Sequence, residues 1–193
     1  MAKISSARED MLSAATELFR ARGYEGVGIA ELLEKAGAPR GSLYFHFPGG
    51  KEQIGAEVVE RVGRHVALRF RALHESGVDL ETFIERVFKT TAKESKDRCY
   101  KATCPMAVIA AEVDTQSPKL AAAVREVFSS WESEIAEATR TRGMSAKNAD
   151  TFASALVGAM EGAFIVSKAQ ASSTAHINAS RAMKALAAAL MAS

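Results

Sequence analysis

The chain has 193 residues, a formal net charge of +2 and two cysteines. A chain of this length can bury one substantial core, or two small ones, without disulfides or metal ions. Cys99 and Cys104 are five positions apart with no histidine close by, so their spacing favours neither a zinc site nor a disulfide framework. With so small a net charge, any affinity for nucleic acid must come from the local placement of positive residues.

Helix-favouring residues dominate the composition. Alanine is abundant, aromatic residues make up 7%, four prolines occur, and alternating Val, Ile and Thr runs are missing, which together predict an all-α fold. No stretch approaches the roughly 18 uninterrupted apolar residues of a membrane span. The start, MAKISSARED, lacks the apolar core and cleavage site of a signal peptide. We therefore expect a cytoplasmic protein that does not enter a membrane.

Three helices are predicted near the N-terminus. Ser6 and Glu9 have the spacing of a capping box, which predicts a helix from about residue 6 to 22 that ends at Gly23. A second helix of about two turns begins at residue 29 and is closed by Gly37. The loop after it is about four residues long, which is the length found in a helix-turn-helix.

The third helix is very short, with Pro39 at its first position and Pro48 after its end. The three helices are expected to enclose a small core formed by Leu12, Leu18, Phe19, Ile29, Leu32, Leu33, Leu43 and Phe47.

The rest of the chain predicts a larger helical domain. A long amphipathic helix runs from Lys51 to about Glu75, with apolar residues at four-residue spacing. Start signals for five further helices follow, at Asp79, Thr103, Ser117-Pro118, Ser145 and the 172–174 cluster. The sequence thus predicts about nine helices, divided into a helix-turn-helix domain over residues 1–50 and an effector-binding and dimerisation domain over residues 51–193.

The third helix has the character of a DNA-reading element. No acidic residue lies between Lys35 and Lys51. Leu43 and Phe47 are four residues apart and should face inward, which leaves the opposite face for DNA. Arginine can bond a guanine edge twice, serine can bond a base or phosphate, and an exposed aromatic ring can pack on a thymine methyl. The side chains left on or beside the open face are Arg40, Gly41, Ser42, Tyr44, Phe45 and His46.

Lys51 stands in the first turn of the long helix. A cation there opposes the positive end of the helix dipole and costs about 0.3 to 1 kcal/mol. A DNA phosphate docked at this helix start would offset the cost and could also bind the free amides of the first turn, helped by the flexible Gly49-Gly50.

The segment GYEGVGIAELLEKAGAPRGSLYFHFPGGKEQI resembles the DNA-binding domain of the TetR family of repressors, over about residues 8 to 55. The resemblance implies that Tyr44, His46 and Lys51 contact phosphates, while Arg40, Ser42 and Phe45 lie where bases are read. GAPRGSLYFHFPGGKEQ, with CPM and AAEV further on, is similar to the LmrA/YxaF-like subgroup. Gly28 and Pro39 depart from the family pattern, since many members have a capping Ser or Thr at both positions.

A single short recognition helix covers few base pairs, so we expect a symmetric homodimer on double-stranded operator DNA. The last two helices are the expected interface, because small residues there allow close helix approach. Alternatively, Gly158 and Gly162 fit packing inside one subunit. The predicted interface residues are Phe152, Ala155, Gly158, Ala159 and Gly162.

The family resemblance also implies an effector pocket in the C-terminal domain, for a small hydrophobic or aromatic molecule. Large adaptable side chains there can fill a core or line such a cavity. The indole N–H of Trp131 needs a partner when buried, and we expect a ligand or Glu112 to provide it. The candidate ligand-binding residues are Phe88, Met106, Ile109, Phe128, Trp131, Met160 and Phe164.

The sequence therefore predicts a repressor that binds a palindromic operator as a dimer and is released when an effector changes the spacing of its recognition helices. No cofactor, metal or catalytic residue is expected. One alternative is an architectural DNA-binding dimer without effector, which a fully packed C-terminal interior would favour. A helical enzyme is the other, but the sequence has no GxSxG, HExxH or phosphate-loop motif, and its four histidines are scattered.

Overall fold

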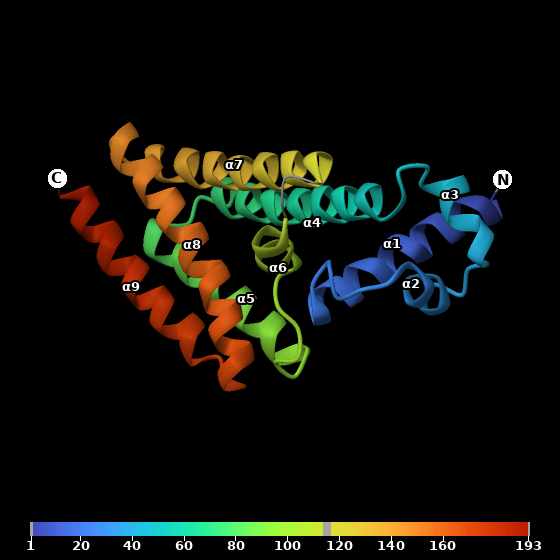
Figure 1. Ribbon diagram of the computed structural model, residues 1–193. Coiled ribbons are helices and arrows are strands. Elements are labelled where there is room, and N and C mark those ends of the chain that lie inside the picture. The colour runs from blue at the N-terminus through green and yellow to red at the C-terminus, as the bar shows by residue number, and fades with distance from the viewer. Residues whose placement is uncertain (1, 114–116, 193) are drawn as a thin grey trace. The chain divides into compact units, whose positions relative to one another are not determined.

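The computed structural model describes residues 2–113 and 117–192, and every regular element in these ranges is a helix. Within these ranges the elements are nine α-helices and one short 3-10 helix, which confirms the all-α prediction. Figure 1 shows the arrangement of the α-helices. The chain forms two compact units, one made of residues 1–62 and 104–126, the other of residues 63–103 and 127–193. Both units combine separate stretches of sequence, so the division after residue 50 stays a prediction about function.

The first unit contains the predicted helix-turn-helix. Its helices are α1 (Ala2–Arg22), α2 (Ile29–Lys35), the 3-10 helix η1 (Arg40–Ser42) and α3 (Leu43–His46). The capping box at Ser6 was a wrong prediction, because α1 begins at Ala2 and a cap requires a residue outside the helix. Gly23 and Gly37 have φ values of +84° and +62°, as expected for left-handed residues that end helices.

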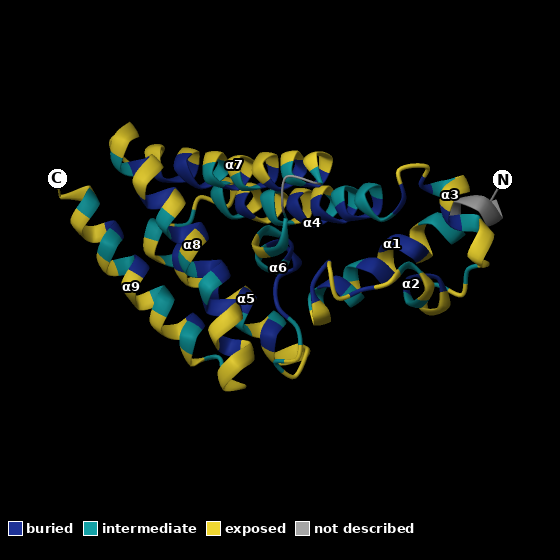
Figure 2. Ribbon diagram, viewed as in Figure 1, coloured by how far each residue is buried: buried dark blue, intermediate teal, exposed yellow. Residues whose placement is uncertain are grey.

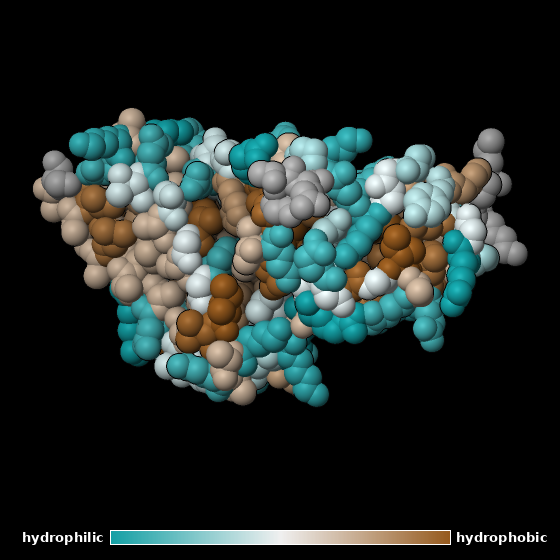
Figure 3. Space-filling view, viewed as in Figure 1, coloured by the Kyte–Doolittle hydropathy of each residue, from teal (hydrophilic) through white to brown (hydrophobic). Residues whose placement is uncertain are grey.

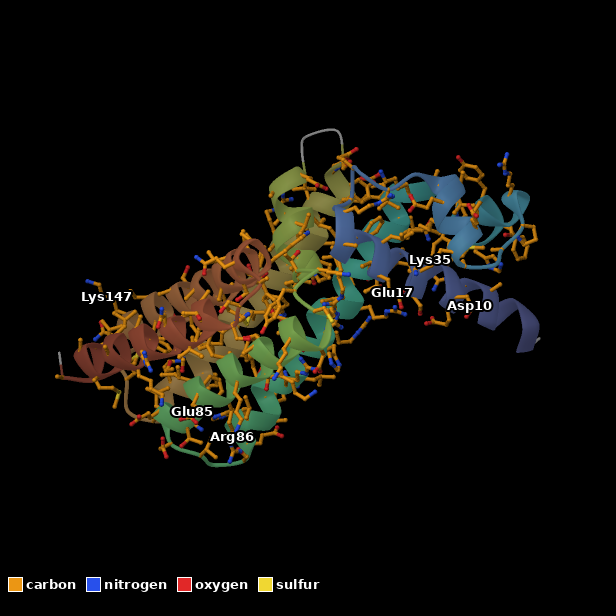
Figure 4. All side chains as sticks on the ribbon, turned by 90° about the horizontal axis from the view of Figure 1, so that it is seen from below. Asp10, Glu17, Lys35, Glu85, Arg86 and Lys147 are labelled. Carbon is orange, nitrogen blue, oxygen red and sulfur yellow. The ribbon has the colours of Figure 1, made fainter. Side chains whose placement is uncertain are left out.

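Apolar side chains from all the N-terminal helices form the core of this unit. Of the predicted set, Leu18 and Ile29 are half-buried and the others are buried. Helix α4 (Gly50–Glu75) contributes Ile54 and Val58, both fully buried. An ion pair between Glu17 and Lys35, 2.8 Å apart, joins α1 to α2, and Figure 4 shows the two side chains next to each other. These contacts fix α2 and the turn against α1.

Helix α6 (Pro105–Glu112) and the start of α7 (Pro118–Arg140) complete the first unit. The predicted cap at Thr103 was wrong: the residue before the helix is Cys104, and Pro105 occupies the first turn, where a missing amide proton costs nothing. The predicted start of a helix at Ser117-Pro118 is confirmed.

The second unit consists of the remainder of α4 and α7 together with α5 (Leu80–Asp97), α8 (Ala146–Gln170) and α9 (Thr174–Met191). Helices α5, α8 and α9 pack side by side (Figure 1). The caps at Asp79 and Ser145 are confirmed, since their side chains accept hydrogen bonds from the amides of Thr82 (2.8 Å) and Asn148 (3.3 Å). Figure 2 shows that α8 and α9 each have a buried and an exposed side.

By length and composition alone, α8 could cross a membrane. Half of its most apolar stretch is buried inside the protein, however, and the core helix of a globular protein can have the same length and composition. Internal packing therefore accounts for the buried half of this helix.

Candidate nucleic-acid interface

The recognition segment η1–α3 places its side chains on two distinct sides. Leu43 and Phe47 are completely buried, as predicted from their spacing. On the other side, Tyr44 and Phe45 are 63% and 71% exposed, while the side chain of Arg40 is also exposed. A single exposed apolar side chain is ordinary, but adjacent exposed rings form an apolar patch of the kind that marks interaction sites. This face has the chemistry required for the major groove of DNA.

Local contacts define the shape of this face. Pro39 lies just before the helix, with φ −61° and ψ 143°, so it precedes the first helical position to which we assigned it. The Ser42 hydroxyl donates to the Pro39 carbonyl oxygen at 2.7 Å, and its own oxygen can still accept a bond. The rings of Phe45 and His46 meet edge to face, with centroids 5.0 Å apart. Gly41 is exposed, while His46 and Ser42 are half-buried.

Lys51 has protein partners that the sequence did not reveal. Its ammonium nitrogen lies 4.3 Å from the centroid of the Tyr24 ring and 4.0 Å from a carboxylate oxygen of Glu25. Cation–π and ionic contacts of this kind offset part of the cost of a cation at a helix start. Burial, assisted by the charges of Glu25 and Glu52, raises the pKa of Tyr24 to about 12, so the ring remains neutral at physiological pH.

The amides beside Lys51 are already used within the protein. The Gly49 amide donates to the side-chain oxygen of Gln53 at 2.9 Å, and the Gly50 amide donates to the Phe47 carbonyl at 2.8 Å. These two amides are therefore not free for a phosphate, and the expected contact with the first turn would fall to the amides that follow them. The half-buried Lys51 ammonium group remains a candidate for a phosphate contact.

The candidate ligand-binding residues belong to both units. Met106 and Ile109 lie on α6 in the first unit, whereas the other five belong to the second. Phe128 is half-buried and the other six are buried. The expected partner of Trp131 was wrong: its indole N–H donates to the Gly63 carbonyl at 2.8 Å. Rings from this set also contact other aromatic groups, with centroids 5.6 Å apart for Phe128 and Trp131 and 5.1 Å for Phe164 and His176.

The expected dimer residues divide between the surface and the core. Phe152 is completely buried, so it offers no surface to a partner. Gly158 is exposed, and among the described residues no atom lies within 4 Å of a Cβ built on Gly158 or Gly162. These glycines thus do not serve close packing inside one subunit, which was the alternative. Ala155, Ala159 and Gly162 are half-exposed on the same helix.

Further apolar residues extend this surface. Ile165 and Val166 continue the stripe along α8, and Ile177 on α9 is 49% exposed. Figure 3 shows apolar and weakly apolar surface along α8 and α9. We define the α8 stripe as Ala155, Gly158, Ala159, Gly162, Ile165 and Val166.

A helix-turn-helix with an exposed, acid-free recognition helix, followed by a helical domain, defines a DNA-binding regulator. Comparison with known proteins gives the family. The family model "Bacterial regulatory proteins, tetR family" matches residues 11–58, and "Transcriptional regulator LmrA/YxaF-like, C-terminal domain" matches residues 81–182. The HTH-type transcriptional regulator LmrA of Bacillus subtilis (strain 168) is 34% identical over 170 residues, which cover 86% of this chain and 89% of LmrA.

A second relative and two solved structures are also similar to this chain. YxaF, an HTH-type transcriptional regulator of the same organism, is 28% identical over 167 residues, which cover 86% of this chain and 87% of YxaF. The crystal structure of the regulatory protein TetR from Rhodobacter sphaeroides matches the fold with a TM-score of 0.83 at 21% identity, over 92% of this chain and 96% of the other. Reduced NemR of E. coli has a TM-score of 0.76 at 23% identity, over 93% and 96%. The chain belongs to the TetR family of transcriptional regulators, with an LmrA/YxaF-like C-terminal domain.

Proposed function

We propose that the protein is a homodimeric cytoplasmic repressor that binds a palindromic operator and is released by a small hydrophobic or aromatic effector. The observation that carries the proposal is the exposed face of η1–α3, where large apolar and basic side chains remain in water. Each subunit would insert this face into one major groove, with half-sites about 34 Å apart or a multiple of that distance.

Within this interface we assign some residues to base contacts and others to phosphate contacts. Arg40, Ser42 and Phe45 would read base edges, and Gly41 would allow the backbone to come close to them. Tyr44, His46 and Lys51 would bind phosphates, which fixes the position of the protein on the duplex but carries no sequence information.

Fluorescence anisotropy with an operator duplex and a random duplex tests this division. The operator probe comes from a gel shift with DNA upstream of the protein's own reading frame. Lys51→Ala should weaken binding to both duplexes equally and lower the salt slope by about one. Arg40→Ala should weaken operator binding by about 1 to 3 kcal/mol and random binding much less. An equal loss on both duplexes for Arg40→Ala would refute its assignment to base reading.

A second candidate is an architectural DNA-binding dimer that has no effector. It is favoured by the burial of Phe88, Trp131, Met160 and Phe164, and by the Gly63 carbonyl that already satisfies the Trp131 indole. The two candidates differ in their response to aromatic small molecules. A ligand-responsive repressor should gain thermal stability and lose operator affinity with at least one compound of a panel; an architectural protein should do neither. In both candidates the chain has no catalytic role.

A further inference from the structure

The last residue of α6 reaches the turn that follows α1. One carboxylate oxygen of Glu112 accepts hydrogen bonds from two successive backbone amides, those of Tyr24 at 2.5 Å and Glu25 at 2.9 Å. Bonds from amides to a carboxylate are among the stronger hydrogen bonds in proteins, and a pair of them fixes the direction of the peptide that donates. Glu112 therefore holds the 24–25 peptide in a defined place.

The turn is shaped to receive this carboxylate. Gly23 has φ +84°, and a Cβ built on it would lie 2.1 Å from the other carboxylate oxygen of Glu112. Only glycine satisfies both the left-handed backbone and the close approach. The contact between α6 and the turn thus depends on two residues, Gly23 and Glu112, that are far apart in the sequence.

The peptide held by Glu112 carries the two partners of Lys51. The Tyr24 ring lies under the ammonium nitrogen, and the Glu25 carboxylate lies 4.0 Å from it. The Tyr24 ring is itself confined, by the edge of Phe19 at 5.4 Å between centroids and by Gly55, whose added Cβ would be 2.8 Å from the ring. A continuous set of contacts inside one compact unit therefore leads from Glu112 to the ammonium group of Lys51.

We propose that Glu112 is a positioning residue for DNA binding. By fixing the 24–25 peptide, it fixes the ring and the carboxylate that hold the Lys51 ammonium where a phosphate can meet it. Without Glu112, Lys51 keeps its charge but loses its defined position. Its side chain must then be ordered when DNA binds, and the conformational entropy lost at that step weakens binding. The inference rests on the proposed function, since it requires that Lys51 bind DNA phosphate.

A double-mutant cycle tests the inference. Operator affinity is measured by anisotropy for the wild type, Glu112→Ala, Lys51→Ala and the double variant. Each single change should weaken binding about three- to tenfold, and the double variant should be no weaker than Lys51→Ala alone, because residues that act through each other are not additive. Glu112→Gln keeps one acceptor oxygen and should recover most of the affinity. Glu126→Ala, an exposed glutamate in the same unit, should stay within about twofold of wild type.

Multiplicative losses in the double variant would overturn the inference, because they would show that Glu112 acts independently of Lys51. Unchanged affinity in Glu112→Ala beside a clear loss in Lys51→Ala would overturn it as well, while leaving the proposed function intact. If the wild type binds no operator, the proposed function fails. If the wild type binds but Lys51→Ala loses nothing, the phosphate contact assigned to Lys51 fails, and this inference fails with it. Circular dichroism checks that the variants fold. Should Glu112→Ala not fold, the same cycle is run with Glu112→Gln, where a smaller loss that vanishes in the Lys51→Ala background is the supporting result.

Discussion

His176 on α9 is a completely buried histidine. The hydroxyl oxygens of Thr91 and Ser95 on α5 each lie 3.0 Å from one of its ring nitrogens. A neutral imidazole has one donor and one acceptor nitrogen, so two hydroxyl groups satisfy it completely. Burial lowers the pKa of His176 to about 4, and the charge of Glu94 acts weakly in the opposite direction. The native protein therefore keeps this ring neutral well below the pH at which the unfolded chain protonates it.

Because the pKa is depressed on folding, His176 makes stability depend on pH. Its contribution is complete above about pH 6.5 and is lost as the pH falls toward 4, since the unfolded chain then binds a proton that the native protein does not. The expected loss is up to about 3 kcal/mol in the free energy of unfolding, measured by urea denaturation at several pH values. His176→Gln should be less stable at pH 7.5 but show a flatter dependence. The exposed His65 serves as the control: His65→Gln should keep the wild-type slope, and an equal slope in His176→Gln would contradict this account.

At the scale of helices, α4 and α7 approach closely at a glycine. A Cβ built on Gly63 would lie 2.3 Å from a methyl carbon of Val127, and the Gly63 carbonyl accepts the indole bond from Trp131 at 2.8 Å. Glycine inside a helix costs about 1 kcal/mol relative to alanine. Close packing and the buried indole bond compensate for that cost.

We therefore expect Gly63→Ala to lower the free energy of unfolding by about 1 to 3 kcal/mol, although alanine favours helix. In a Val127→Ala background the clashing methyl groups are gone, so the same change should cost much less. Urea denaturation of the four proteins gives the coupling. Equal costs in both backgrounds would show that the close approach is not what requires glycine.

At the scale of the whole molecule, the α8 stripe is the surface that a second copy would cover. Small residues let two helices approach, and the exposed Ile165 and Val166 supply apolar area beside them. A glutamate at position 158 would place a charge in the middle of such an interface, where desolvating it without a partner is costly.

Gly158→Glu should therefore give a helical monomer in sedimentation velocity at micromolar concentration, with operator binding weakened because one subunit reads one half-site. Lys147→Glu also alters charge on α8, but it lies at the start of the helix and points into solvent (Figure 4). It should remain dimeric. A wild-type protein that is monomeric under the same conditions, or a dimeric Gly158→Glu, would end the proposal for this surface.

Features that depend on residues a few positions apart could be predicted from the sequence. The helical class, the inward-facing Leu43 and Phe47, the caps at Asp79 and Ser145 and the left-handed Gly23 all have this origin. Capping and periodicity act within one or two turns of a helix, so the local sequence contains their cause. Where a cap was predicted wrongly, as at Ser6 and Thr103, a suitable side chain was present but the helix began elsewhere.

Only the tertiary structure decided which buried groups meet. Glu112 and Tyr24 are 88 residues apart, Trp131 and Gly63 are 68 apart, and His176 and Thr91 are 85 apart. Periodicity tells that a helix face is buried but not what it is buried against, which is why the partner of Trp131 was predicted wrongly. A buried polar atom must find a partner, yet any of several groups along the chain can satisfy that need. The packing of whole helices makes the choice, and a single sequence does not contain it in any local pattern.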